Sequence, residues 1–135
     1  PIPVGVSYAP TTPESIVTTT SAANINSTSG KFSCTAGPSG IVIVVASAYY
    51  EWSATDTLFW RLAGTVNTTT RAAEVGVSGQ KRVVTQTIIV SGLTPGATIT
   101  ETLQHWTVSS GSATCKIGGV SSTMLPPLTL LAIPA

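Results

Sequence analysis

The feature that most constrains this chain is the regular spacing of its turn-forming residues. Short runs rich in Val, Ile and Thr are separated by Gly, Pro, Ser and Asn roughly every 8–12 residues, the spacing of sandwiches and barrels. No long window carries the apolar spacing of an amphipathic helix, and β-branched residues, which favour strands, outnumber the helix formers Glu, Lys and Gln. The chain is therefore predicted to be all-β, an antiparallel β-sandwich of jelly-roll type with about nine or ten strands.

The predicted strands follow the runs between the turn residues. They are Ser15–Thr20, Lys31–Thr35, Ile41–Trp52, Thr57–Val66, Arg71–Val77, Lys81–Val90, Thr98–Val108, Ser112–Ile117 and Pro127–Ile133. In 57–66, strand alternation assigns Leu58, Trp60 and Leu62 to one face and Phe59, Arg61 and Ala63 to the other. The last strand is almost wholly apolar, so we expect it to be central and covered on both faces, where neighbouring subunits could supply one cover.

The N-terminal segment differs from the rest because prolines interrupt it. Pro1, Pro3 and Pro10 restrict it to an edge strand or to a strap over the surface. Residues 1–14 are therefore predicted as an extended arm, and residues 15–135 as a single sandwich domain, since 135 residues is the size of one domain.

Charge is scarce in this chain. Only 8% of its residues are Asp, Glu, Lys or Arg, against about 25% in ordinary globular proteins. Either the chain is a monomer with a hydroxyl-rich surface, or copies of itself or a partner cover much of that surface, and we favour the second interpretation. The net charge of +1 gives no support for binding nucleic acid or an acidic membrane, and no apolar run has the length of a membrane helix.

The residues that carry chemistry are few. His105 is the only histidine, and no G-x-S-x-G motif supplies a nucleophile beside it. Glu51 and Asp56 flank a turn, where carboxylates are usually solvated rather than paired for glycosidase chemistry. Cys34 and Cys115 lack the spacing of metal ligands, and we expect small buried side chains there, with a disulfide as the less favoured alternative. We predict no enzyme activity and no catalytic, metal or cofactor site.

Glu101 and His105 are placed on one face of a strand by their spacing, together with Ile99 and Leu103. One interpretation is a proton-linked contact between His105 and Glu101 of the same or a neighbouring chain. The other is a partly exposed polar pair with no special role.

The C-terminal third carries a more specific pattern. It reads LTPGATITETLQHWTVSSGSATCKIGG and then, after a short loop, LTLLAIPA. This pattern resembles the jelly-roll heads of bacteriophage tail-fibre and other virion proteins, in the broad complement-globular-head and tumour-necrosis-factor-like fold group. The matching positions are Gly96, Thr98, Ile99, Leu103, Gln104, Trp106, Gly111, Ala113, Thr114, Leu128 and Thr129. His105 interrupts the family's Gln-Trp step, which indicates either a β-bulge that re-aims the side chain of Trp106 or a misplaced alignment.

The resemblance implies a homotrimeric, structural virion protein. Its expected partners are itself and a major capsid protein or another virion protein, and its expected location is the virion, after synthesis in the host cytoplasm without a signal peptide. A capsid decoration or cement protein is the favoured role, with an N-terminal arm that docks on the shell through Ile2, Val4, Val6 and Tyr8. The alternative is a receptor-binding head of a tail fibre or baseplate that recognises a host surface glycan or protein.

Aromatic residues gather at the end of the strand 41–52, in the group Tyr49-Tyr50-Glu51-Trp52. Alternation sends Tyr50 and Trp52 to one face and Tyr49 to the other, so at least one face belongs to the core. We favour core plus subunit interface over a glycan site for this group. The candidate trimer or partner interface comprises Tyr50, Trp52, Trp60, Glu101, Leu103, His105, Trp106 and Leu130.

Overall fold

The computed structural model describes residues 2–66, 72–120 and 124–135, and these residues form two antiparallel sheets packed as a sandwich. Its strands are β1 (Val4–Tyr8), β2 (Glu14–Val17), β3 (Ala23–Asn24), β4 (Lys31–Thr35), β5 (Val42–Trp52), β6 (Asp56–Gly64), β7 (Ala72–Gly76), β8 (Lys81–Val90), β9 (Thr98–Thr107), β10 (Ala113–Ile117) and β11 (Leu128–Pro134). The predicted all-β antiparallel sandwich is therefore confirmed.

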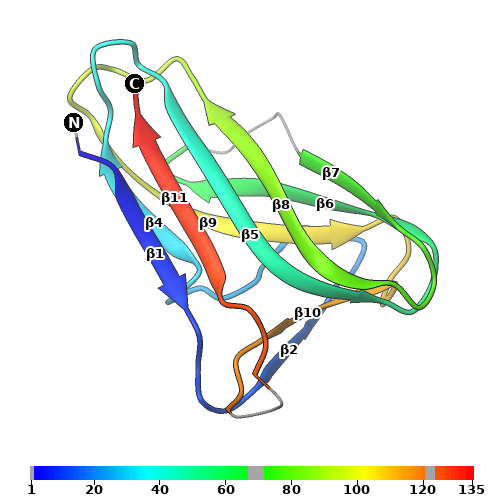
Figure 1. The fold of residues 1–135 in the computed structure, drawn as a ribbon. Helices are drawn as coiled ribbons and strands as arrows, with labels where there is room; N and C mark the ends of the chain where they lie inside the picture. Colours follow the sequence, from blue (N-terminus) through cyan, green and yellow to red (C-terminus); the bar gives the residue numbers. More distant parts are fainter. Residues whose placement is uncertain (1, 67–71, 121–123) are drawn as a thin grey trace.

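Sheet A contains six strands arranged around β5. β8 pairs with one edge of β5 along nearly its whole length, while β11 and β10 share the other edge one after the other. β1 lies beyond β11, and β2 lies beyond β10. In Figure 1, β1, β11, β5 and β8 run side by side, and the chain ends lie at the same end of these strands.

Sheet B contains five strands arranged around β9 and crosses behind sheet A in Figure 1. β6 pairs with one edge of β9, and β4 and β3 pair with its other edge. β7 extends the sheet beyond β6. Both sheets thus have one long central strand whose second edge is divided between two shorter strands.

The core lies between the sheets and follows strict strand alternation. In β5, every second residue from Val42 to Trp52 is buried and the residues between them face outward. The predicted alternation in β6 is confirmed, because Leu58, Trp60 and Leu62 are buried. Burying such a side chain stabilises the fold by roughly 1.5–3 kcal/mol, so the inward rows hold the two sheets together.

Strand positions agree closely with the sequence expectations at the centre of the fold. The predicted bounds of β4 and β8 are those observed, and the other predicted strands shift by one to a few residues at their ends. Arg71, the predicted start of β7, lies outside the described residues. β3 was not predicted, because its two residues are exposed and lie within a polar stretch that reads as a loop.

The predicted bulge in β9 is wrong. β9 pairs with β6 without interruption from Thr107 opposite Leu58 to Glu101 opposite Gly64. Buried and outward positions alternate through His105, so this residue takes an ordinary inward place and Trp106 an ordinary outward one.

The N-terminal segment forms an edge strand, one of its two predicted forms. β1 pairs with β11 from Val4 opposite Ala132 to Tyr8 opposite Leu128. Val4, Val6 and Tyr8 pack against the core of their own chain. These three side chains are therefore engaged within the sandwich, and among the four predicted docking residues only Ile2 is exposed.

Candidate binding surfaces

The interior contains a cluster of polar side chains centred on the hydroxyl of Tyr50. Trp60 Nε1 donates a hydrogen bond to this hydroxyl at 3.0 Å, and His105 Nδ1 lies 2.6 Å from it. Because the indole can only donate, the Tyr50 hydroxyl accepts from Trp60, and the tautomer of neutral His105 sets the direction of the bond between this hydroxyl and Nδ1. Burial lowers the pKa of His105 to about 4 and raises the pKa of the neighbouring Cys115 thiol to about 12. The cluster is thus neutral, closed and part of the core.

Glu101 is a second buried polar residue on the same strand. Its Oε1 accepts a hydrogen bond from the backbone N–H of Val66 at 2.6 Å, while Oε2 has no partner among the described residues. Burial raises the pKa of this carboxyl group. Glu101 and His105 do share a face, as predicted, but both are buried and each bonds to a different partner, so both interpretations of the pair are wrong.

The predicted partner interface lies mostly inside the molecule. Tyr50, Trp52, Trp60, Glu101, Leu103, His105 and Leu130 are all buried between the sheets of their own chain. Inward alternation places them there, and a second chain cannot reach them without unfolding the sandwich, so the prediction is wrong for these seven. Trp106 is the exception, since it is half-buried and faces outward.

Trp106 belongs to an aromatic and polar group on the outer face of sheet B. Its ring stacks on Phe59 with centroids 5.3 Å apart and planes inclined by 22°, and the guanidinium of Arg61 lies 5.8 Å from its centroid. Arg61 Nε donates to Gln104 Oε1 at 2.8 Å, and Gln104 Nε2 donates to Asn24 Oδ1 at 2.9 Å. We call these five residues the aromatic platform. Alternation indicates which residues face outward, but only the pairing of β6 with β9 brings them together.

The outer face of sheet A is apolar at the end nearest the termini. Five residues of β5, β8 and β11 share this area: Ile43, Val45, Ile89, Leu131 and Ile133, which we call the apolar face. Ile89 is 53% exposed and Leu131 is 41% exposed. The described residues therefore leave one side of the last strand uncovered, although β11 does lie between two neighbours as its sequence predicted.

The other end of the same outer face is charged. Glu51 of β5 stands opposite Lys81 of β8 in the strand register. Its Oε1 forms an ion pair with Lys116 Nζ at 3.0 Å, and its Oε2 accepts from the hydroxyl of Tyr49 at 2.9 Å. The bond from Lys116 is the main cause that lowers the pKa of Glu51. Glu51 is thus anionic at neutral pH and lies within a small network at the surface. We call Glu51 and Lys81 the charged row.

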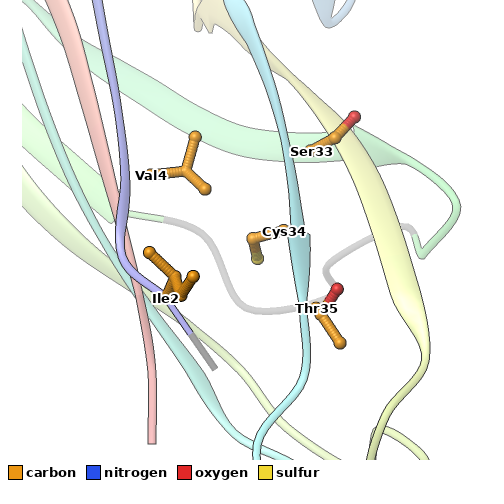
Figure 2. Close-up of a pocket in the computed structure, with 5 residues that line it drawn as sticks. All are labelled: Ile2, Val4, Ser33, Cys34 and Thr35. Carbon is orange, nitrogen blue, oxygen red and sulfur yellow. The ribbon is translucent and has the colours of Figure 1, made fainter.

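A cleft of about 370 Å³ opens where the edge strands β1 and β4 meet. Figure 2 shows Ile2, Val4 and the thiol of Cys34 in the gap between these strands, with Ser33 and Thr35 turned away from it. Burial raises the pKa of the Cys34 thiol. As expected, Cys34 and Cys115 are both buried, and they are unpaired.

Neither metal-ligand clusters nor membrane helices occur in the described part of the chain. No group of three or more His, Cys, Asp and Glu residues there is placed to hold a metal ion. No helical segment among residues 2–66, 72–120 and 124–135 has the length and apolarity needed to cross a bilayer.

The sequence matches no protein-family model and no curated protein. Solved structures similar to the chain include two from infectious bursal disease virus. A chain of the crystal structure of its T13 viral particle has 12% identity and a TM-score of 0.52, and the match covers 97% of this chain and 34% of that one. A chain of the Gx strain has 16% identity, a TM-score of 0.45 and coverage of 97% and 37%. The chain spans about a third of the length of these two, and the first likeness shows that its fold also occurs in a virus particle.

Proposed function

We propose that this domain is a structural component of a virion, and specifically a homotrimeric decoration protein that binds and cements the capsid surface of a bacteriophage. The observation that carries the proposal is the apolar face, left open in a chain of which only 8% of the residues are charged. The resemblance of the C-terminal third to virion jelly rolls supports this role. The shared fold with a chain of a virus particle agrees with it.

The physical reason is the cost of leaving such a face in water. Burial of apolar surface contributes roughly 25 cal/mol per Å², and a contiguous exposed apolar patch on a soluble protein marks an interaction site. A protein that works by association with copies of itself and with a shell has a use for this surface. A free monomer gains nothing from it.

The test is co-sedimentation of the purified protein with particles of the virus that encodes it. We expect saturable binding to particles that lack the protein and no binding to particles already saturated with it. Thermal release of the genome from the particles should shift upward when the protein is bound, because a cement adds contacts between neighbouring shell subunits. Absence of the protein from the particle fraction at saturating concentration would refute the decoration role.

A receptor-binding head is the second candidate, and the aromatic platform is the observation that favours it. A stacked pair of aromatic rings beside Arg61 and two side-chain amides offers apolar contact and hydrogen bonds together, as at the centre of many recognition surfaces. Binding of labelled protein to host cells separates the two roles. A receptor binder should adhere and lose adhesion in Trp106→Ala, with Val108→Ala, an exposed residue beyond the end of the same strand, as the control. A decoration protein should not adhere at all.

A further inference from the structure

We propose that the outer face of sheet A is the surface through which copies of this chain associate, around a symmetry axis that runs along the strands. The inference deepens the proposed function, because it rests on a homotrimer and identifies the contact that forms it. The neighbour on this face is a second copy of the chain, contacted by equivalent rows of residues.

The strand register arranges the outward side chains of this face in rows across the sheet. From the terminal end, the rows across β11, β5 and β8 are Ile133, Ile43 and Ile89, then Leu131, Val45 and Thr87, then Thr129, Ser47 and Thr85. Tyr49 and Val83 form the next row, and Glu51 and Lys81 form the last. The face thus changes along the strands from fully apolar, through rows in which hydroxyl-bearing side chains predominate and Val83 is the apolar exception, to charged.

This gradient determines how two such faces can meet. If the strands of two copies ran in opposite directions, the charged row of one copy would lie on the isoleucine row of the other. Burying charges against apolar side chains costs several kcal/mol when their partners are removed. An axis along the strands avoids this cost, because it brings rows of equal height together: isoleucine meets isoleucine, and the charged row meets the charged row.

The charged row also explains why a copy of the same chain fits. Lys81 forms no direct ion pair within the described part of the chain, although its charge adds to the bond from Lys116 in lowering the pKa of Glu51 opposite it. Around an axis along the strands, Lys81 of one copy approaches Glu51 of its neighbour, and the same contact repeats for every copy. The charges are complementary between copies, and the register of the apolar rows is fixed at one end by an ion pair.

The area of the face shows how much of the interface it can supply. Four strands (β1, β11, β5 and β8) about 4.8 Å apart, with about nine residues at roughly 3.3 Å each, cover about 19 by 30 Å, or roughly 570 Å² in plan. A standard interface buries about 800 Å² of accessible surface per partner, and in a trimer this face is divided between two neighbours. The face therefore forms the centre of each contact, and the adjoining edges of the sandwich contribute the rest.

Sedimentation equilibrium of the full chain and of matched variants tests the interface. We expect wild type at micromolar concentration to have three times the mass of the 13.7 kDa chain, and Ile89→Lys to have the mass of one chain. The control is Val75→Lys, an equally exposed apolar residue on a strand of sheet B, which should remain trimeric. Circular dichroism of each variant establishes that it is folded. A folded monomeric wild type, or a folded Ile89→Lys variant that is still trimeric, would overturn the proposal.

A charge swap tests the contact between the charged rows and does not depend on apolar substitutions. Glu51→Lys and Lys81→Glu each leave like charges facing each other between copies, so each variant alone should be largely monomeric. The double variant Glu51→Lys/Lys81→Glu should regain assembly, because opposite charges then meet at all three contacts of the trimer. A folded double variant that assembles no better than the single variants would refute the proposed axis. A wild-type trimer of this geometry that does not bind particles would refute the decoration role and support the interface. A wild-type monomer that binds particles would refute the interface and support binding to the shell.

Discussion

Acidification from pH 7 to pH 4 probes the buried cluster around Tyr50, and His105 sets the size of the effect. Burial lowers the pKa of His105 from its ordinary value of about 6.5 to about 4. A difference of about 2.5 units at about 1.36 kcal/mol per unit corresponds to about 3 kcal/mol. Between about pH 6.5 and pH 4, the histidine of the unfolded chain is protonated to a greater extent than that of the folded chain. The stabilising contribution is therefore complete above about pH 6.5, falls as the pH falls, and is lost below about pH 4.

The measurement is urea unfolding followed by tryptophan fluorescence, at several pH values between 7.5 and 4, for wild type and His105→Gln. Glutamine can still form a hydrogen bond with the hydroxyl of Tyr50, as donor or acceptor, but does not titrate. Glu101 acts in the opposite direction, because its raised pKa makes its folded form more favourable as the pH falls. Since Glu101 is present in both proteins, its contribution cancels in the difference between them.

Between pH 7.5 and pH 4, the free energy of unfolding of wild type should fall by about 3 kcal/mol relative to that of His105→Gln. At pH 7.5 wild type should be the more stable protein, because histidine fits the site between Tyr50 and the core. If the two stability curves run parallel from pH 7.5 to 4, His105 is not desolvated in the folded chain, and the argument from burial fails.

Three further predictions concern single sites. Gly76→Ala should lower the free energy of unfolding by roughly 1–3 kcal/mol, because an added Cβ would overlap the ring of Trp52, which packs on this glycine. The control is Gly5→Ala, which has open space around it and should be nearly neutral in the same urea unfolding measurement. Glu101→Gln should raise the free energy of unfolding at pH 7 and lose this advantage as the pH falls, because the raised pKa of Glu101 means that burial disfavours its charged form. Identical dependence of the unfolding free energy on pH in the two proteins would contradict this. In the folded protein, Cys34 at the cleft should react with a thiol reagent faster than Cys115, whose pKa is raised to about 12. Mass spectrometry measures the labelling of each cysteine, and faster labelling of Cys115 would contradict its place in a closed core.

Most of the fold could be predicted from the sequence because strand alternation and turn punctuation are local signals. The bounds of β4 and β8 follow from runs of β-branched residues that end at turn residues. β3 could not be found in this way, because two exposed residues in a polar stretch become a strand only through their pairing with β9.

The candidate interface could not be predicted in the same way, because alternation divides residues into two faces without showing which face is inside. The sequence predicts Tyr50, Trp52 and Trp60 at a partner interface, with Tyr50 and Trp52 also in the group expected to contribute to the core, and the structure places all three between the sheets. The resemblance to known virion proteins added the error in β9, since the additional residue His105 between Gln104 and Trp106 predicted a bulge that the pairing of β9 with β6 does not contain. The true partners of His105 are Tyr50 and the core, which only the packing of the two sheets reveals.

The two outer faces of the sandwich provide the strongest argument about function, because folding makes the same demand on both. Between β4 and β9, sheet B shows that hydroxyl residues satisfy this demand: Ser33 pairs with Thr100 at 2.6 Å, and Thr35 with Thr98 at 3.3 Å, on strands that need only β propensity and solubility. At the terminal end of sheet A, the equivalent outward positions carry Ile43, Ile89 and Ile133 instead. Threonine there would form the same strands at less risk of aggregation. The isoleucines therefore support the proposed contact outside this chain, and the gradient from apolar to charged along the face sets the orientation proposed for that contact.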